Sequence, residues 1–302
     1  MDGILLIDKP RGATSHDVVA WARRALGTRA VGHTGTLDPM ATGVLVLLVG
    51  EATKLSAHLT ADAKRYEATV QFGAETRTLD AEGELTARDD SPRARPDADA
   101  IARRLAAMVG PMQQVPPSVS AIKVDGVAMH ARVRRGEEVA LAPRAVSLDA
   151  ARVLAWRDEA LGAACDVEIA CSKGFYVRAL ARDLAASLGT LGHLTALRRT
   201  AAGRVAIGDC LDGAVLRAAR DDAGARARVR EALRPFAFAA TLMPSRAVSA
   251  DAATALRHGK RVPDEGPDET VLVFDDAAAP VCVARREGAV LTVARGIVTT
   301  PG

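Results

Sequence analysis

The sequence predicts a mixed α/β protein in which one large domain is followed by a small β domain. Apolar, strand-like runs alternate with amphipathic helical segments over residues 1–240. From about Pro244, short strands bounded by Gly and Pro replace them, which is typical of a separate β domain. The length of 302 residues also exceeds the usual size of one domain. We therefore place the large domain at 1–240 and the small one at 244–302.

The first fifty residues predict two strands and a helix. The run GILLID at 3–8 is a short buried strand, closed by Lys9-Pro10. Ser15 opens a helix that reaches Leu26 and is stopped by Gly27. The continuous apolar run VLVLLV at 44–49 is suited to a central strand, and a further helix is expected over residues 51–59.

Two alternating segments predict half-buried strands in the middle of the chain. In KRYEATVQF, residues 64–72, Tyr66 lies on the apolar face, and residues 164–171 alternate in the same way. A proline-containing polar loop at 88–99 precedes a helix that ends near Val109. The other expected elements are an insertion at 116–144, helices at 175–188, 211–233 and 249–257, and strands at 271–274, 280–286 and 289–298.

Composition excludes several classes of protein. The four cysteines are dispersed without a C-x-x-C pair, which argues against zinc and disulfide frameworks and favours a reduced, cytoplasmic setting. The apolar N-terminal run is too short for a signal peptide, and no membrane-spanning helix or membrane partner is expected. The net charge is only +3, and 34 of the 40 basic residues are arginine, which fits an Ala- and Arg-rich composition. Only local clusters of arginine therefore carry functional weight.

The stretch GHTGTLDPMATGVL, residues 32–45, holds a single carboxylate, Asp38. Asp-Pro commonly starts a helix, so a capping role is the simplest interpretation. The ATG that follows interrupts any long helix, the glycines allow a close backbone approach, and the stretch leads into a central strand. The stretch matches no phosphate-binding loop, metal site or serine-hydrolase motif. What remains is a lone carboxylate that acts as nucleophile or base without a cofactor.

A second candidate segment is CSKGFYVRALARDL at 171–184. Arg178 falls in the first turn of its helix, where the helix dipole disfavours a cation, so a carboxylate partner from elsewhere is expected. A solvated arginine is the alternative, and Tyr176 could be an ordinary core aromatic. Residues 171–204 hold six basic side chains against one acid, which favours a partner that carries phosphate.

These motifs together resemble the bacterial tRNA pseudouridine-55 synthases of the TruB type. The resemblance includes the stretch at 32–45, K-R-Y at 64–66 and C-S-K-G-x-Y-x-R at 171–178. LLIDKP at 5–10, PPSVSAIKVDG at 116–126 and LRRT at 197–200 fit in the same order. The match runs from about residue 3 to 204.

The resemblance implies a role for each of seven residues. Asp38 matches the catalytic aspartate, and Arg178 matches the arginine that pairs with it. Tyr66 matches the tyrosine that stacks on the target uracil, and a role as the final base follows by analogy only. The remaining matches are Tyr176 and Leu197 in the uracil pocket, His33 at the T-loop with its extruded base, and Lys9 beside the pocket.

The resemblance also implies the fold and the partner. The expected catalytic domain surrounds a bent, mostly antiparallel sheet flanked by helices, with residues 113–144 as an RNA-gripping thumb and a PUA-like C-terminal domain. The substrate would be the T-loop and T-stem of tRNA, bound by a monomer that needs no cofactor and no metal. Two positions depart from the family pattern: His130 replaces a frequent tyrosine of the thumb, and Arg77 replaces a frequent acid near Asp80. An RNA-folding factor that acts without catalysis remains the alternative.

Overall fold

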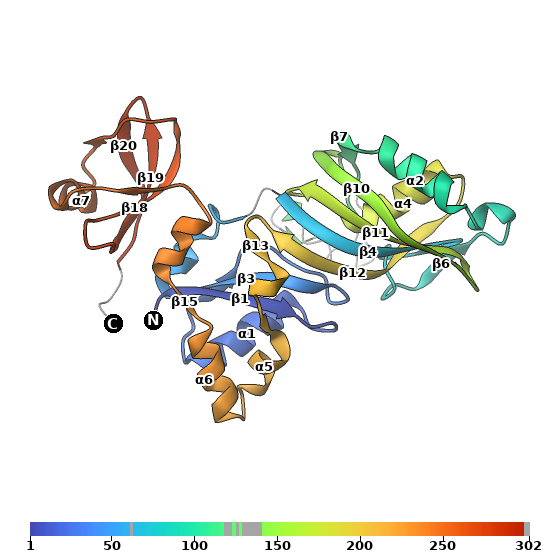
Figure 1. The fold of residues 1–302 in the computed structure, drawn as a ribbon, viewed down its shortest axis with the longest axis horizontal. Coiled ribbons are helices and arrows are strands. Elements are labelled where there is room, and N and C mark those ends of the chain that lie inside the picture. Colours follow the sequence, from blue (N-terminus) through green and yellow to red (C-terminus); the bar gives the residue numbers. More distant parts are fainter. Residues whose placement is uncertain (61–62, 118–122, 125–126, 129–140, 299–302) are drawn as a thin grey trace. The chain divides into compact units, whose positions relative to one another are not determined.

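The computed structural model describes residues 1–60, 63–117, 123–124, 127–128 and 141–298 (Figure 1). The chain forms two compact units. The first comprises Met1–Pro39, Gly43–Ala61 and Gly203–Gly302, and the second comprises Met40–Thr42 and Asp62–Ala202. Among the described helices, none combines the length and the apolar character needed to cross a membrane.

The first unit is built on two long antiparallel strands. Strand β1 (Gly3–Lys9) pairs along its whole length with β3 (Thr42–Val49), from Gly3 opposite Val49 to Lys9 opposite Gly43. Both strands are buried almost throughout, as their continuous apolar sequences predict. Three short strands of this unit also pair with them: β2 (Val31–His33) beside β3, and β14 (Leu211–Asp212) and β15 (Arg234–Pro235) beside β1.

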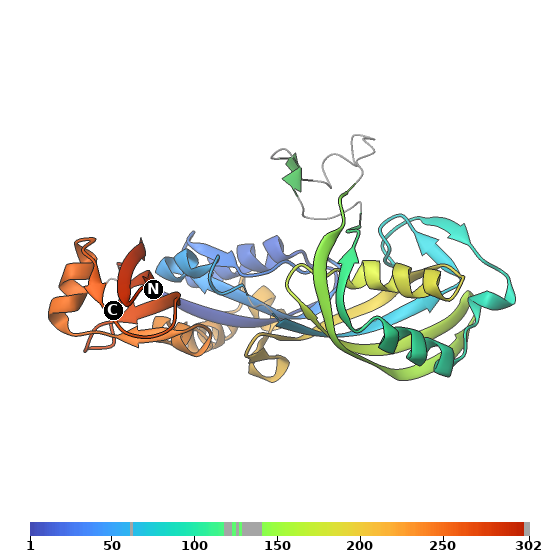
Figure 2. The same cartoon turned by 90° about the horizontal axis from the view of Figure 1, so that it is seen from above.

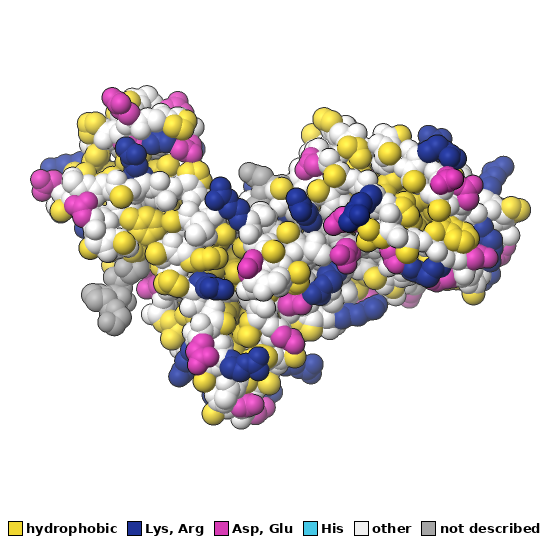
Figure 3. Space-filling model, viewed as in Figure 1, with side chains coloured by type: hydrophobic (Ala, Val, Ile, Leu, Met, Phe, Trp, Pro, Cys, Tyr) yellow, Lys and Arg dark blue, Asp and Glu magenta, His cyan; other side chains and the backbone are white. Residues whose placement is uncertain are grey.

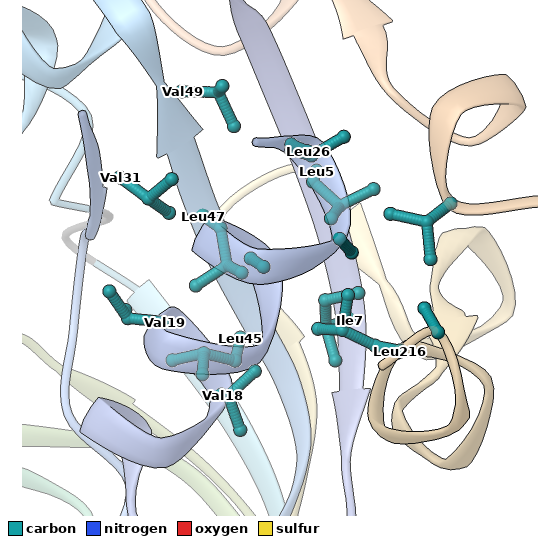
Figure 4. Close-up of a cluster of buried hydrophobic side chains, with 14 of the residues drawn as sticks. Leu5, Ile7, Val18, Val19, Leu26, Val31, Leu45, Leu47, Val49 and Leu216 are labelled. Atoms are coloured by element: carbon teal, nitrogen blue, oxygen red, sulfur yellow. The ribbon is translucent and has the colours of Figure 1, made fainter. Parts of the chain in front are cut away.

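Helices α1 (Ser15–Leu26), α5 (Gly213–Ala218) and α6 (Ala223–Glu231) supply the other half of this core. Figure 4 shows Val18 and Val19 of α1 facing Leu45 and Leu47 of β3, with Leu216 of α5 beside Ile7. Each fully buried aliphatic side chain of this kind contributes about 1.5–3 kcal/mol to stability. The core therefore fixes the loops that leave β1 and β3.

Capping defines α1. The Thr14 hydroxyl accepts a hydrogen bond from the Asp17 amide at 3.0 Å, and the Asp17 carboxylate accepts one from the Thr14 amide at 2.8 Å. Gly27 ends the helix in the left-handed region, at φ +66°.

The second unit contains a mostly antiparallel sheet in the order β12, β4, β11, β10 and β7. Helices α2 (Ala98–Ala107) and α4 (Val177–Ser187) lie on the same side of it (Figure 2). This arrangement confirms the predicted mixed fold with a mostly antiparallel sheet. The strands are β4 (Ala63–Phe72), β7 (Gly110–Gln114), β10 (Arg144–Glu159), β11 (Gly162–Ser172) and β12 (Gly192–Ala202).

The C-terminal part is a small five-stranded sheet with one helix and a hydrophobic core of its own. Within it, the buried Arg286 guanidinium binds the carboxylates of Asp264 at 2.8 Å and Glu269 at 2.5 Å. The predicted small β domain is thus confirmed. Its elements are β16 (Ser245–Ala247), α7 (Ala250–Arg257), β17 (Val262–Pro263), β18 (Glu269–Phe274), β19 (Pro280–Glu287) and β20 (Val290–Gly296).

Two predicted helices were wrong in detail. The helix expected over residues 51–59 is a 3₁₀ helix, η1 (Gly50–Leu55). The segment 211–233 holds two helices because Asp222 caps the second one, and its carboxylate accepts the Gly224 and Ala225 amides. The remaining short elements are β5 (Ala74–Thr76), β6 (Leu85–Arg88), η2 (Pro92–Ala94), β8 (Lys123–Val124), β9 (Val127–Ala128), β13 (Val205–Ala206), η3 (Ile207–Asp209) and η4 (Phe236–Thr241).

The predicted thumb at 113–144 connects two paired neighbours. Gln114, the last residue of β7, lies opposite Arg144, the first residue of β10. Residues 118–122, 125–126 and 129–140 lie outside the described part of the chain, and this range includes His130. The thumb and the exact domain boundaries stay predictions.

Candidate active site

Asp38 lies in the loop between β2 and β3, and its neighbours on both sides are fixed. The buried Ser15 hydroxyl accepts from the Leu37 amide at 2.9 Å and donates to the Leu37 carbonyl at 3.1 Å. The Pro39 carbonyl accepts from the Gly12 amide at 2.8 Å. The segment after Asp38 is a short turn followed by β3, so this aspartate does not begin a helix. Its backbone is therefore held firmly, as a reactive side chain requires.

Lys9 is fully buried and is one of the largest fully buried side chains among the described residues. Its ammonium donates to the carbonyls of Pro10 at 3.1 Å, Ala13 at 2.5 Å and Pro39 at 3.3 Å. A buried ammonium is tolerated only where acceptors replace the lost water. Lys9 thus ties the turn after β1 to the loop that carries Asp38, and its place beside the pocket stays a prediction.

His33 is the last residue of β2 and is partly buried. Its carbonyl accepts from the Ser56 hydroxyl at 3.3 Å, and its ring meets the His16 ring edge-on, with the ring centroids 5.8 Å apart. The side chain therefore lies near the start of α1, in the same unit as Asp38 and Lys9.

Tyr66 lies on β4 and is only 7% exposed, on the apolar face predicted from the alternation. In the sheet it stands opposite Ile169 of β11 and Arg199 of β12. Leu197 stands opposite Ala68, two residues along the same face. The structure thus brings Tyr66 and Leu197 onto one face of neighbouring strands.

Tyr176 precedes α4 and occupies its N-cap position. The buried side chain of Gln114 binds both backbone groups of this residue: its carbonyl oxygen accepts the Tyr176 amide at 2.8 Å, and its amide donates to the Tyr176 carbonyl at 3.0 Å. Strand β7 therefore positions the start of α4, and with it both Tyr176 and Arg178.

Arg178 lies in the first turn of α4 and is 5% exposed, so it is not a solvated arginine. Its Nη1 donates to the Thr78 carbonyl at 2.8 Å and lies 3.5 Å from the buried Asp80 carboxylate. The Thr78 hydroxyl in turn donates to Asp80 at 2.5 Å. A buried carboxylate, that of Asp80, thus lies beside the Arg178 guanidinium, and the predicted pairing of Arg178 with Asp38 stays a prediction.

A cleft of about 410 Å³ opens in the second unit beside the segment 77–80, which holds Asp80. Arg182, one helical turn after Arg178, reaches it and donates to the Val115 carbonyl at 3.0 Å. The described ends of the predicted thumb line the cleft together with residues of the segment 75–79. The lining residues are Glu75, Thr76, Arg77, Leu79, Thr86, Val115, Pro116, Pro117, Leu141 and Arg182.

The predicted basic face at 171–204 is smaller than the count of charges indicated. Arg178 and Arg199 are buried, and Arg182 is paired with Asp183 at 2.8 Å. On the face shown in Figure 3, basic and acidic side chains are interspersed.

The seven predicted site residues fall in both units. Lys9, His33 and Asp38 belong to the first unit, whereas Tyr66, Tyr176, Arg178 and Leu197 belong to the second. In the described parts of both, His, Cys, Asp and Glu form no group of three that could hold a metal ion. Burial raises the pKa of Cys165 to about 11 and that of Cys171 to about 12, so neither thiol is a nucleophile at neutral pH.

Sequence reasoning missed two supporting residues, Gln114 and Ser15 in its contact with Leu37. Gln114 ends a short strand without clear alternation, and only its burial and its two hydrogen bonds identify it. Ser15 reads as an ordinary helix start, because the capping residues of α1 are next to it. A small hydroxyl beside a helix cap gives no signal that it binds a distant loop.

Comparison with known proteins gives the family. Residues 23–177 match the TruB family pseudouridylate synthase N-terminal domain. A protein of Nocardia farcinica named tRNA pseudouridine synthase B is 49% identical over 261 residues, which cover 86% of this chain and 81% of the relative. Proteins of the same name are 47% identical in an Arthrobacter species, over 87% and 82%, and 44% identical in Corynebacterium aurimucosum, over 95% and 93%.

Solved structures agree with the fold. A structure of an H/ACA RNP bound to a substrate RNA containing 2′-deoxyuridine matches with a TM-score of 0.70 and 20% identity, over 98% of this chain and 85% of that one. A Cbf5–Nop10–Gar1 complex matches with a TM-score of 0.70 and 23% identity, over 98% and 84%. On the strength of its sequence matches, the chain belongs to the TruB family of pseudouridylate synthases.

Proposed function

We propose that the chain isomerises uridine to pseudouridine at position 55, in the T-loop of tRNA, with Asp38 as the catalytic carboxylate. The observation that carries this proposal is 44–49% identity to proteins named tRNA pseudouridine synthase B over 81–93% of their length. The firmly held Asp38 loop and the buried Arg178 support the same conclusion.

The reaction breaks the bond between ribose C1′ and uracil N1, turns the base and joins C1′ to C5. The proton on C5 is lost, and N1 gains one, so there is no net oxidation and no cofactor is required. The target base lies inside a folded loop and must be extruded before a side chain can reach it. Unstacking costs a few kcal/mol, which stacking and phosphate contacts offset.

Asp38 must be ionised to act. Burial alone would raise the pKa of a carboxyl group, and a neighbouring guanidinium opposes that effect. We assign this part to Arg178, which Asp80 and the Thr78 carbonyl hold in place. Two roles suit the carboxylate: covalent attack on the ribose or the base, or removal of a proton from the ribose.

The other predicted residues would form the base pocket. Tyr66 would stack on the uracil and is the candidate for removing the C5 proton, while Tyr176 and Leu197 would line the pocket. His33 would help to hold the opened T-loop, and Lys9 would fix the Asp38 loop through its three carbonyl contacts. We further propose that a monomer without cofactor or metal carries out the reaction.

The test is to incubate the protein with unmodified tRNA and to map pseudouridine at nucleotide resolution. We expect a single new pseudouridine at position 55, formed without added cofactor. Modification at another position would contradict the assigned site, and the absence of any pseudouridine would contradict the activity.

The alternative is an RNA-folding factor that acts without catalysis. The presence of both Asp38 and Arg178 favours the enzyme. Refolding of tRNA by Asp38→Asn protein discriminates the two, since a folding factor would keep this activity after loss of isomerisation.

A further inference from the structure

A groove of about 630 Å³ lies in the first unit, where the turn after β1 meets α1 and α5. It contains four arginines, two aspartates and one tryptophan. All seven charged or aromatic side chains come from elements of this unit, and six of them are exposed. They are Arg11, Asp17, Trp21, Arg24, Arg217, Arg220 and Asp221.

The charges of the groove are only partly balanced. The Asp17 carboxylate accepts from the amide and the hydroxyl of Thr14, so it serves the cap of α1. Asp221 lies 3.7 Å from Arg220. Within the described chain, Arg11, Arg24 and Arg217 form no salt bridge. The groove therefore has a surplus of positive charge, with four arginines against two aspartates.

An aromatic side chain stands among these cations. Trp21 is half-buried on α1, and the Arg217 guanidinium lies 5.9 Å from its ring centroid. Arginine binds phosphate oxygens through parallel N–H donors, and an aromatic face accepts a base or sugar. Arginines grouped around a partly exposed aromatic side chain are a combination that suits the phosphates and sugars of a nucleic-acid strand.

The groove is joined to the Asp38 loop. Arg11 and Gly12 form its end, and the Gly12 amide donates to the Pro39 carbonyl at 2.8 Å. Gly12 adopts φ +81°, a conformation that favours glycine, so the turn can present Arg11 while it keeps this hydrogen bond. A ligand in the groove would therefore lie beside the loop that carries the carboxylate.

We propose that this groove binds the phosphate backbone of the tRNA substrate, as a site separate from the uracil pocket. This assignment rests on the proposed function. A free nucleotide is disfavoured because the N-terminal turn of α1, the usual site for terminal phosphates, presents the Asp17 carboxylate. A polyanion needs no such terminus, since each arginine contacts one phosphate.

The test compares two variants with the same change of charge. Arg11→Gln/Arg24→Gln alters two arginines of the groove that form no salt bridge among the described residues, and Arg228→Gln/Arg230→Gln alters exposed arginines of α6 that do not line it. We expect the groove variant to bind unmodified tRNA about tenfold more weakly. The slope of log affinity against log salt concentration should also become shallower, by about the amount that corresponds to two phosphate contacts. The control variant should bind like the wild type.

Equal binding by the groove variant and the wild type, or an equal loss in both variants, would overturn the proposal. Binding is measured without turnover, so this result stands whether or not pseudouridine forms. If the wild-type protein forms no pseudouridine in unmodified tRNA, that result would instead count against the proposed function.

A second readout uses the tryptophan itself. The chain has two tryptophans, so Trp156→Phe leaves Trp21 as the single emitter. We expect saturating tRNA to change the Trp21 emission, and millimolar inorganic phosphate to change it far less. No change with tRNA, or the same change with phosphate alone, would contradict an RNA site.

Discussion

Lys9 shows how a single buried charge can shape a reactive loop. Its ammonium reaches three carbonyls, and one of these belongs to Pro39, next to Asp38. The sequence places Lys9 at the end of a strand, where a lysine is usually solvated. Its burial follows from the path of the loop, which no local pattern encodes.

We predict that Lys9→Met loosens the Asp38 loop. The three carbonyls lose a charged donor, and hydrogen bonds of this kind contribute about 1.5–3 kcal/mol each. Hydrogen exchange should become faster at the Gly12 and Leu37 amides, and the turnover number should fall about tenfold. Lys54→Met, at a partly exposed pair with Glu51, is the control and should leave both quantities unchanged.

A second prediction concerns the Arg178–Asp80 pair. Asp80→Asn removes a buried carboxylate that lies 3.5 Å from the Arg178 guanidinium, so the free energy of unfolding should fall by about 3–5 kcal/mol in urea titrations. Glu84→Gln is the matched control, because its 3.5 Å contact with Arg77 is exposed, and its loss should stay below about 0.5 kcal/mol. A loss in Asp80→Asn as small as that in Glu84→Gln would show that the buried pair does not stabilise the fold.

At the scale of elements, period-2 alternation predicted β4 and β11 closely, because one face of each strand is buried. The α1 helix was predicted to the residue, since its cap and its Gly27 stop are strong local signals. Prediction failed where local signals compete. Residues 50–55 form a 3₁₀ helix, and Asp222 divides the helical segment 211–233.

A salt bridge holds three strands of the second unit together and makes its stability depend on pH. Arg157 of β10 binds Asp166 of β11 at 2.5 and 2.9 Å, and Thr69 of β4 donates to the same carboxylate at 2.7 Å. These hydrogen bonds, that from Arg157 above all, lower the pKa of Asp166 below its usual value of 3.8. Because the pKa is lower in the folded protein, the stabilisation is fully present above pH 3.8. It is lost as the pH falls through the lowered pKa.

We therefore predict that Asp166→Asn lowers the free energy of unfolding by about 1 kcal/mol near neutral pH. This difference from the wild type should shrink as the pH falls below 3.8 and through the lowered pKa. Urea titrations at a series of pH values provide the measurement. A difference that stays constant down to pH 2 would contradict the assignment.

At the scale of the molecule, the predicted site draws on both compact units. The motifs of the sequence predicted all seven residues through the family resemblance, but the sequence alone could not show what holds these residues in place. The Ser15–Leu37 and Gln114–Tyr176 contacts join segments more than twenty residues apart. Such long-range contacts depend on strand register and loop path, and these emerge only from the folded chain.

The most direct test of the central claim is to follow pseudouridine at position 55 of unmodified tRNA with wild-type, Asp38→Asn and Asp90→Asn proteins. Asp90 is an exposed carboxylate in a surface pair with Arg88 and serves as the control. We predict full modification by the wild type and by Asp90→Asn. Asp38→Asn should form no product while it binds tRNA nearly as tightly as the wild type. Product formation by Asp38→Asn at the wild-type rate would show that this carboxylate does not perform the reaction.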